Sequence, residues 1–451
     1  MRSIGLDIGT TTICAVVLDG ETGLILETVT RQNDSFIKSP NVWERIQDSS
    51  LIMEQVTAII SDLAGKYAPI ASIGLAGQMH GIVYIDGEGA AVSPLYTWQD
   101  GRGDLPYKDG LSYAAHLSKA TGYKSATGFG AVTHFYNSVN NLVPESARYF
   151  CTIHDYAAMK LGRAAKPLLH PSNAASIGLY DMEGNGFDAR AISAAGMDAA
   201  FFPEVSKVDA LVGTTKEGVP VAVTLGDNQA SFMGAVKSST CLSVNIGTSS
   251  QISVFTDKYG KDSRVDIRPY AGDGFLLVGS PLCGGRSYAL LEGFFRSVVQ
   301  MATGKDCGRL YDSMDALAFD FASLENKLRV STRFSGTREN PALRGSITNL
   351  GTDNFTAQHF IVGVLQGIVE ELYGFYEEMK PLLSAKPDML VCSGNGVRLN
   401  KPLQKIISAM FRMPVSIPVY KEEAAYGAAL YAFVAGGLKS LTEVQALIRY
   451  E

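Results

Sequence analysis

Short apolar stretches separated by glycine turns open the chain. Residues 3–8, 12–18 and 24–30 each show the apolar pattern of a β-strand. A Gly-Thr-Thr turn at 9–11 joins the first two tightly, and Asp-Gly at 19–20 is a strong turn signal before the third. The pattern therefore predicts a three-stranded antiparallel meander at the start of the chain.

A helix and a buried strand are predicted next. Apolar residues spaced for one face of a helix run from Ile52 to Leu63. A short apolar run at 73–76 then predicts a buried strand that leads into a loop bounded by Gly77 and Gly81. Residues 86–150 are rich in turn signals, so we expect irregular structure there.

The second half of the chain repeats this order. Its first three predicted strands span 241–246, 251–255 and 274–279. Helical periodicity returns between Ile361 and Phe375, and a buried strand at 389–392 runs into another glycine loop. The last predicted helix, from 422 to about 434, is rich in alanine.

The agreement between the halves predicts an internal duplication. In each half a strand ends in an [Asp/Asn]-Ile-Gly-Thr turn, and Gly9 and Gly247 of these turns lie 238 residues apart, about half of the chain. Two more strands, a helix and a strand with a glycine loop follow in both. We expect an α/β protein with a boundary near 232–240, and hence two domains, residues 1–235 and 236–451.

Composition narrows the class of protein. The chain has 451 residues, 46% hydrophobic and 19% charged, so it can bury ample core and is not a long disordered protein. A net charge of −6 argues against nucleic acid as a partner. Six cysteines without a C-x-x-C pair predict reduced thiols. With no apolar signal segment and no 18-residue apolar stretch, we expect a cytoplasmic protein with no membrane partner.

The two Gly-Thr turns are candidates for phosphate binding. A tight glycine turn between strands exposes backbone N–H groups, lets a phosphate approach without a Cβ clash, and has threonine hydroxyls as further donors. Asp7, at the end of the first strand, is placed to hold Mg²⁺ directly or through water. The alternative for one turn alone is an ordinary polar hairpin; the second turn, at 245–250, favours two loops that grip a polyphosphate.

Asp227 is the candidate general base. It follows an apolar strand at 221–225 and Gly226, and it opens a predicted helix. An acid at a strand end is well placed to take a proton from a bound substrate. The alternative is that Asp227 is the N-cap of the helix, a common position for aspartate.

Three further segments carry polar groups on predicted loops. The loop at 77–81 brings together an amide, an imidazole and a thioether, which suit sugar hydroxyls; the alternative is a packed loop. Residues 98–102 offer an aromatic ring, an acceptor and a cation, or simply a surface turn with a local Asp–Arg pair. The loop at 393–396 can seat a nucleobase against bare backbone, or it is a plain strand–helix turn.

Other well-known catalytic motifs are missing from the sequence. No G-x-x-x-x-G-K-[ST] segment occurs, which excludes a P-loop, and no H-E-x-x-H segment occurs. The six histidines are dispersed, and no G-x-S-x-G elbow supports a serine hydrolase.

Taken together, the motifs resemble those of the FGGY family of carbohydrate kinases, in the actin–hexokinase–Hsp70 superfamily. The resemblance covers essentially the whole chain, from the turn at 7–12 to the alanine-rich helix that contains Glu423. It implies two actin/hexokinase-like (ribonuclease H-like) domains with a ligand cleft between them. Its implied ligands are ATP, Mg²⁺ and a small-molecule sugar.

The resemblance also implies roles for individual residues, with Asp227 as the base that deprotonates the sugar hydroxyl. The predicted substrate-binding residues are Gln78, Met79, His80, Trp98, Asp100 and Asp227. The predicted ATP-binding residues are Gly9, Thr10, Thr11, Thr12, Gly247, Thr248, Gly285, Gly394 and Asn395. The predicted metal ligands are Asp7 and Asp227.

The implied activity is ATP-dependent phosphorylation of a terminal hydroxyl of a ketose. The loop at 77–81 is similar to that of xylulokinases and sedoheptulokinases, and the segments at 97–102, 152–156 and 172–176 resemble sedoheptulokinases more closely. We expect sedoheptulose as substrate, with D-xylulose as the alternative. A non-catalytic sugar sensor is the alternative of another class, against which Asp7 and Asp227 argue. The oligomeric state is left open, a homodimer included.

Overall fold

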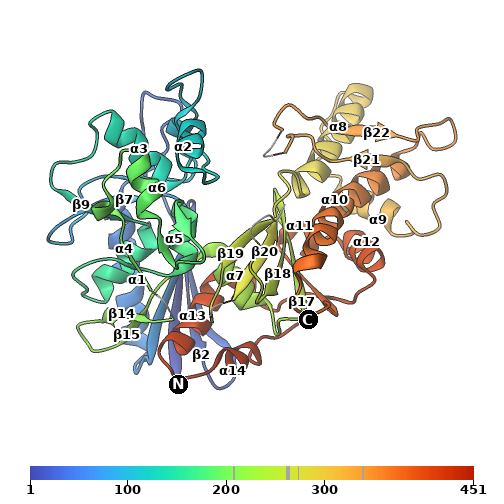
Figure 1. Ribbon diagram of the computed structural model, residues 1–451. Helices are drawn as coiled ribbons and strands as arrows, with labels where there is room; N and C mark the ends of the chain where they lie inside the picture. Colours follow the sequence, from blue (N-terminus) through green and yellow to red (C-terminus); the bar gives the residue numbers. More distant parts are fainter. Residues whose placement is uncertain (207–208, 261–264, 273, 338–339) are drawn as a thin grey trace. The chain divides into compact units, whose positions relative to one another are not determined.

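The computed structural model describes residues 1–206, 209–260, 265–272, 274–337 and 340–451. The chain divides into two compact units, each with its own hydrophobic core. The first unit comprises Met1–Lys237, Pro269–Asp273 and Glu422–Ile448, and the second comprises Ser238–Arg268, Gly274–Lys421 and Arg449–Glu451. The α/β class predicted from the sequence is confirmed, and Figure 1 shows the helices and strands along the chain.

A seven-stranded sheet forms the centre of the first unit, and it contains the predicted meander. β1 (Arg2–Ile8) pairs antiparallel with β2 (Thr12–Asp19), which pairs antiparallel with β3 (Ile25–Gln32). On its other side β1 pairs in parallel with β6 (Ser72–Gly77). Beyond β6 lie β15 (Pro220–Ala222) and β14 (Leu211–Thr214).

A six-stranded sheet in the second unit has the same central arrangement. β17 (Cys241–Ile246) pairs antiparallel with β18 (Ser250–Thr256), which pairs antiparallel with β20 (Phe275–Gly279). β17 pairs in parallel with β23 (Met389–Ser393), as β1 does with β6. The matching order and direction of the strands agree with the duplication inferred from the sequence.

The long helices follow the predicted periodicity. α1 (Ser49–Tyr67) begins after Asp48, whose carboxylate accepts from the N–H groups of Ser50 and Leu51, and it buries the stripe from Ile52 to Leu63. α10 (Ala357–Met379) is its counterpart in the second unit and buries residues on the face that includes Ile361 and Leu372. No helix in the described part of the chain is both long and apolar enough to cross a membrane.

The alanine-rich helix α13 (Glu423–Ala435) belongs to the first unit by its contacts, whereas the linear division at residue 235 assigned it to the second domain. It packs against β1, β6 and α7 (Asp227–Ala235). A Cβ added at Gly427 would lie 1.8 Å from the carbonyl oxygen of Ala230, so only glycine allows this helix–helix approach. Small residues on both helices therefore bring the C-terminal segment back onto the first sheet (Figure 1).

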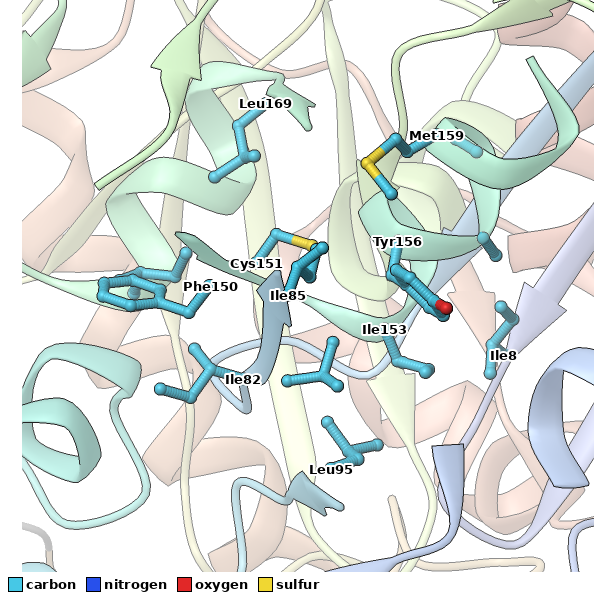
Figure 2. Packing of buried hydrophobic residues seen from close by; sticks show 14 of the residues in the cluster. Ile8, Ile82, Ile85, Leu95, Phe150, Cys151, Ile153, Tyr156, Met159 and Leu169 are labelled. Carbon is cyan, nitrogen blue, oxygen red and sulfur yellow. The ribbon is translucent and has the colours of Figure 1, made fainter. Parts of the chain in front are cut away.

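The prediction of irregular structure for residues 86–150 was wrong. This stretch contains α2 (Tyr113–Thr121), α3 (Gly130–Val139) and β9 (Ala147–Cys151). Seven of the ten residues of α3 are buried, so the helix lacks the one-sided pattern by which a surface helix is recognised. Figure 2 shows part of the core that this region joins, where Cys151 and Ile85 lie between Phe150 and Tyr156 of α4 (Ile153–Leu161).

Candidate active site

Three strand ends meet at one edge of the sheet in the first unit. Ile8, the last residue of β1, is in register with Gly77 of β6, and Gly77 is in register with Gly226 of β16 (Leu225–Gly226). Parallel strands end together at one edge of a sheet, and ligands bind in α/β proteins beyond such ends. The phosphate turn at 9–12, the loop at 78–81 and Asp227 therefore gather at this edge.

Asp7 has the features of a carboxylate that can bind a cation. Its Oδ1 is buried and has no hydrogen-bond partner among the described residues. Burial, and then the charges of Asp227 and Glu422, raise the pKa of Asp7 to about 7. A positive ion would relieve both the desolvation and the repulsion, because each favours the neutral acid.

Mg²⁺ fits this site in the presence of a nucleotide. Within the described ranges, no three His, Cys, Asp or Glu side chains are grouped so that they could hold a metal by themselves. Mg²⁺ usually takes only one or two carboxylates and completes its shell with water and phosphate oxygens. Asp7 and Asp227 match that requirement.

Asp227 is the first residue of α7, not its N-cap. The cap position is Gly226, which has no side chain with which to cap the helix. The N–H of Asn228 donates to Oδ1 of Asp227 over 2.7 Å. A Cβ at Gly226 would lie 2.6 Å from the sulfur of Met79, so Met79 packs directly against the backbone that precedes Asp227.

The first phosphate turn is closed by a bond from the N–H of Gly9 to the carbonyl of Thr12. Two amide side chains outside the predicted motif hold it. Nδ2 of Asn33 donates to the carbonyl of Gly9 over 2.8 Å, and Nε2 of Gln47 donates to the carbonyl of Thr10 over 2.9 Å. The turn is therefore fixed from its carbonyl side.

Gln78 and Trp98, both predicted to bind the sugar, are bonded to the phosphate turn. The hydroxyl of Thr10 donates to Oε1 of Gln78 over 3.2 Å, and Nε2 of Gln78 donates to Gln47 over 2.9 Å. Nε1 of Trp98 donates to the same Thr10 oxygen over 2.9 Å, while the indole stays 46% exposed. Trp98 thus presents a rigid aromatic face beside the turn.

His80 is held in one orientation. Its backbone has a φ of 74°, which is uncommon for a residue with a side chain. Nδ1 lies 2.7 Å from the carbonyl oxygen of Ser176, and the ring stacks on Phe129 at 4.6 Å between centroids. Because that carbonyl can only accept, Nδ1 carries a proton, and the ring is held in place from that side.

Asp100 and Arg102 form a buried ion pair, which excludes the surface turn that the sequence left as an alternative. Asp100 is 0% exposed and Arg102 is 2% exposed. Oδ1 of Asp100 accepts from Nε of Arg102 over 2.6 Å, and Oδ2 accepts from Nη2 over 3.2 Å. The guanidinium also lies 4.2 Å from the ring centroid of Tyr96. A carboxylate so enclosed holds its loop in shape.

The second phosphate turn lies against the start of a helix in the second unit. The N–H of Gly285, the first residue of α8 (Gly285–Thr303), donates to the carbonyl of Gly247 over 2.9 Å. The N–H of Arg286 donates to the carbonyl of Thr248 over 3.1 Å. A Cβ at Gly285 would lie 2.6 Å from the carbonyl oxygen of Gly247, so glycine is needed for this approach.

A cavity of about 840 Å³ opens beside this turn, and its whole lining belongs to the second unit. Four predicted ATP-binding residues line it: Gly247, Thr248, Gly285 and Asn395. Gly394 precedes α11 (Asn395–Arg398) with a φ of 84°, a conformation that favours glycine. A cavity of this size is within the range of small-molecule sites.

Several lining residues were missed by the sequence reasoning. The hydroxyl of Tyr288 donates to Oδ1 of Asp315 over 2.6 Å, and Nδ2 of Asn400 donates to the same oxygen over 2.8 Å. Tyr311 and Arg309 also line the cavity. Tyr311 and Asp315 lie four residues apart on α9 (Tyr311–Ala318), whereas Tyr288 and Asn400 lie 27 and 85 residues from Asp315, so no local signal could have grouped the whole set.

Comparison with known proteins assigns the family. The model of the FGGY family of carbohydrate kinases, N-terminal domain, matches residues 3–234, and that of the C-terminal domain matches residues 242–436. The chain therefore belongs to the FGGY family of carbohydrate kinases, and it is an ATP-dependent sugar kinase.

The individual relatives share only about a fifth to a quarter of their residues with this chain. A sedoheptulokinase of Mus musculus is 26% identical over 482 residues, which cover 95% of this chain and 96% of that protein. A xylulose kinase of Streptomyces coelicolor is 22% identical, with 95% of this chain and 87% of that protein covered. The crystal structure of xylulose kinase from Rhodospirillum rubrum matches with a TM-score of 0.85 at 19% identity, over 100% of this chain and 93% of that one. The structural match confirms the predicted fold.

Proposed function

We propose that this kinase transfers the γ-phosphoryl group of ATP to a terminal hydroxyl of a ketose, and that sedoheptulose is its substrate. The support is the 26% identity to a sedoheptulokinase along nearly the whole of both chains. D-xylulose is the second candidate, because a relative of similar coverage is named a xylulose kinase. We place the reaction in the cytoplasm, where the six free cysteines stay reduced.

The observation that carries the mechanism is the position of Asp227. It begins α7 at the strand-end edge, next to the backbone against which Met79 packs, and its charge is felt by Asp7. A sugar hydroxyl is a poor nucleophile near neutral pH. In the proposed reaction, Asp227 accepts the proton as the hydroxyl oxygen bonds to the γ-phosphorus, while the bond from that phosphorus to the bridging oxygen breaks and ADP leaves.

The sugar would be held by Met79, His80 and the exposed face of Trp98. His80 would contact one hydroxyl, and its ring is held in place by the bond from Nδ1 to the carbonyl of Ser176. Gln78 is proposed to act from behind, since both ends of its amide are bonded to Thr10 and Gln47. For Asp100, direct contact with the sugar remains a prediction, which Asp100→Asn tests.

The nucleotide would be bound by the glycine turns and by the cavity of the second unit. Residues 9–12 supply N–H groups and hydroxyls for phosphate, as do Gly247 and Thr248, and the lining around Gly285 and Asn395 would take the adenosine. Mg²⁺ on Asp7 and Asp227 would supply positive charge against the phosphates during transfer.

A substrate panel tests the proposed activity. ADP release should be measured with sedoheptulose, D-xylulose, ribulose, gluconate and glycerol, each over a range of concentrations. We expect the highest kcat/KM for sedoheptulose. A higher kcat/KM for D-xylulose would reject sedoheptulose as the proposed substrate. The absence of ADP release with all five compounds would reject the proposal that this protein phosphorylates a ketose.

Asp227→Asn tests the proposed base. Asn keeps the size of the side chain but cannot accept the proton, and such a base contributes ~10²–10⁴-fold. We expect kcat to fall at least ~100-fold, with sugar affinity by calorimetry close to wild type. Asp188→Asn is the matched control, because Asp188 is the N-cap of α6 (Ala189–Ala194), and Asn caps helices about as well as Asp. Wild-type kcat in Asp227→Asn would contradict the assignment.

A further inference from the structure

One short helix of the first unit is bonded to both parts of the candidate site. α5 (Pro171–Ile177) lies between the segment that precedes Asp227 and the loop that carries His80. Residues at its start bond the first, and Ser176 near its end bonds the second. Four polar side chains take part in these contacts, and all of them are buried: Ser172, Asn173, Ser176 and Thr224.

On the Asp227 side, a buried network holds the backbone three residues before the carboxylate. Nδ2 of Asn173 lies 3.0 Å from the carbonyl oxygen of Thr224 and 2.8 Å from its hydroxyl oxygen. The Thr224 hydroxyl donates to Oδ1 of Asp155, which also accepts from Asn173 over 2.9 Å. The hydroxyl of Thr152 donates to Oδ2 of Asp155 over 2.6 Å. Both oxygens of this buried carboxylate are therefore occupied.

A second path reaches the residue directly before Asp227. The N–H of Gly226 donates to Oγ of Ser172 over 3.4 Å, and Oγ of Ser172 lies 2.9 Å from Nδ1 of His170. Nε2 of His170 lies 3.4 Å from Oδ1 of Asp209. Because Nδ1 also accepts from the N–H of Ser172, the proton is on Nε2 and is directed to Asp209.

On the sugar side, the same helix fixes the imidazole. Oγ of Ser176 accepts from the N–H of His80 over 3.2 Å, and the Ser176 carbonyl accepts from Nδ1 over 2.7 Å. Oγ of Ser176 itself donates to the carbonyl of Asn173 over 2.8 Å. The serine that orients His80 is thus bonded to the residue that holds Thr224.

We propose that α5, through Asn173, Ser176 and Thr224, is a positioning element that sets Asp227 and His80 relative to each other. The proposal rests on the proposed function, in which Asp227 takes the proton and His80 binds the sugar. A proton acceptor and a sugar-binding group must keep a fixed separation, since a shift of about 1 Å can cost ~100-fold in rate. The network bonds the backbone of Thr224, of Gly226 and of His80, so it can control the separation between Asp227 and the imidazole of His80.

Thr224→Val is the first test. Valine has nearly the same shape but no hydroxyl, so the bond to Asp155 is lost and the segment before Asp227 loosens. We expect kcat to fall ~10-fold while sugar affinity changes less than ~2-fold. Thr224→Ser keeps the hydroxyl and should restore most of kcat. The matched control is Thr256→Val in the second unit, which removes a buried hydroxyl bonded to the carbonyl of Leu382 and should leave kcat unchanged.

Ser176→Ala is the second test, and its expected effect is on KM for the sugar instead of kcat. It removes the acceptor of the His80 N–H but leaves the carbonyl that receives Nδ1. We expect KM for the sugar to rise ~3–10-fold with kcat within ~2-fold. A fall in kcat with KM unchanged would contradict the assigned role of Ser176.

A double variant separates positioning from general damage. If Thr224 acts through Asp227, Thr224→Val should not lower the residual turnover of Asp227→Asn any further. A further ~10-fold loss in the double variant, or wild-type kcat in Thr224→Val beside an inactive Asp227→Asn, would overturn this inference and leave the proposed function intact. Full activity of Asp227→Asn would instead reject the proposed base.

Discussion

Replacing Asp100 by asparagine distinguishes a buried structural pair from a sugar contact. The carboxylate is 0% exposed and accepts four hydrogen bonds, from the N–H and Nε of Arg102 on Oδ1 and from Nη2 of Arg102 and the N–H of Arg45 on Oδ2. An asparagine side chain has one accepting oxygen. In either orientation of the amide, two donors lose their acceptor, and the guanidinium keeps only Glu44, whose Oε1 lies 3.2 Å from Nη2, as a countercharge.

The expected loss of stability is large. Removing one partner of a buried ion pair costs about 3–5 kcal/mol when the other charge stays buried without compensation, and the pair that Arg102 keeps with Glu44 puts the expected cost at the lower end of that range. For a domain of 150–250 residues, 1 kcal/mol corresponds to a shift in Tm of about 2–4 °C. The first unit is slightly larger than that, so at a cost of about 3 kcal/mol the Tm of Asp100→Asn should fall by roughly 6–12 °C. If the carboxylate mainly contacts the sugar, Tm stays near wild type and KM for the sugar rises.

Thermal unfolding followed by circular dichroism, together with steady-state kinetics below Tm, measures both quantities. Asp104→Asn is the control, because Asp104 ends the short 3-10 helix (Gly101–Asp104) of which Asp100 is the N-cap, but is exposed. Its stability should change by no more than about 0.5 kcal/mol. A Tm for Asp100→Asn within 2 °C (roughly 1 kcal/mol at most) of that control would refute the reasoning from the buried pair.

Two further variants test the core of the first unit. Burial lowers the pKa of His134 from 6.5 to about 4, so the unfolded chain takes up this proton first as the pH falls. The free energy of unfolding of the wild type should therefore fall by up to about 3 kcal/mol between pH 6.5 and 4. His134→Gln should not show this loss, and urea unfolding at several pH values measures both proteins. Gly427→Ala should destabilise by at least about 1–3 kcal/mol, since its Cβ would meet the Ala230 carbonyl at 1.8 Å. In the same assay Gly65→Ala is the control for Gly427→Ala and should be neutral or stabilising, because no atom lies within 4 Å of the added Cβ. Equal effects of the two alanine substitutions would refute the packing argument. Equal pH profiles of wild type and His134→Gln would refute the argument from the pKa of His134.

Local signals in the sequence were sufficient for the elements that carry the site. Period-3.6 patterns identified α1 and α10, because each helix buries a regular face. β1 and β17 were recognised as short apolar runs that end in glycine turns, and both are buried at nearly every position. The repeated order also predicted the duplication. Asp7, the loop at 77–81 and Asp227 were joined into one site through the resemblance to the FGGY family, and the strand register brings the three segments to one edge of the sheet.

The sequence did not reveal partners that are distant in the chain. α3 was missed because it is buried on nearly all sides, and α13 was assigned to the wrong half because nothing local records that it packs on α7. Asp100 and Arg102 were left open between a surface pair and a site pair, since their burial depends on partners such as Glu44 and Asn137, which lie 58 and 35 residues from Arg102.

The physical reason is the range of the interactions. Secondary structure, turns and caps depend on residues a few positions apart, so the sequence by itself determined the strands, the glycine turns and the candidate base. Burial, pKa shifts and buried hydrogen bonds depend on which segments pack together across tens or hundreds of residues. Only the tertiary structure showed that Asn33 and Gln47 hold the phosphate turn, and that α5 is bonded to both His80 and the segment before Asp227.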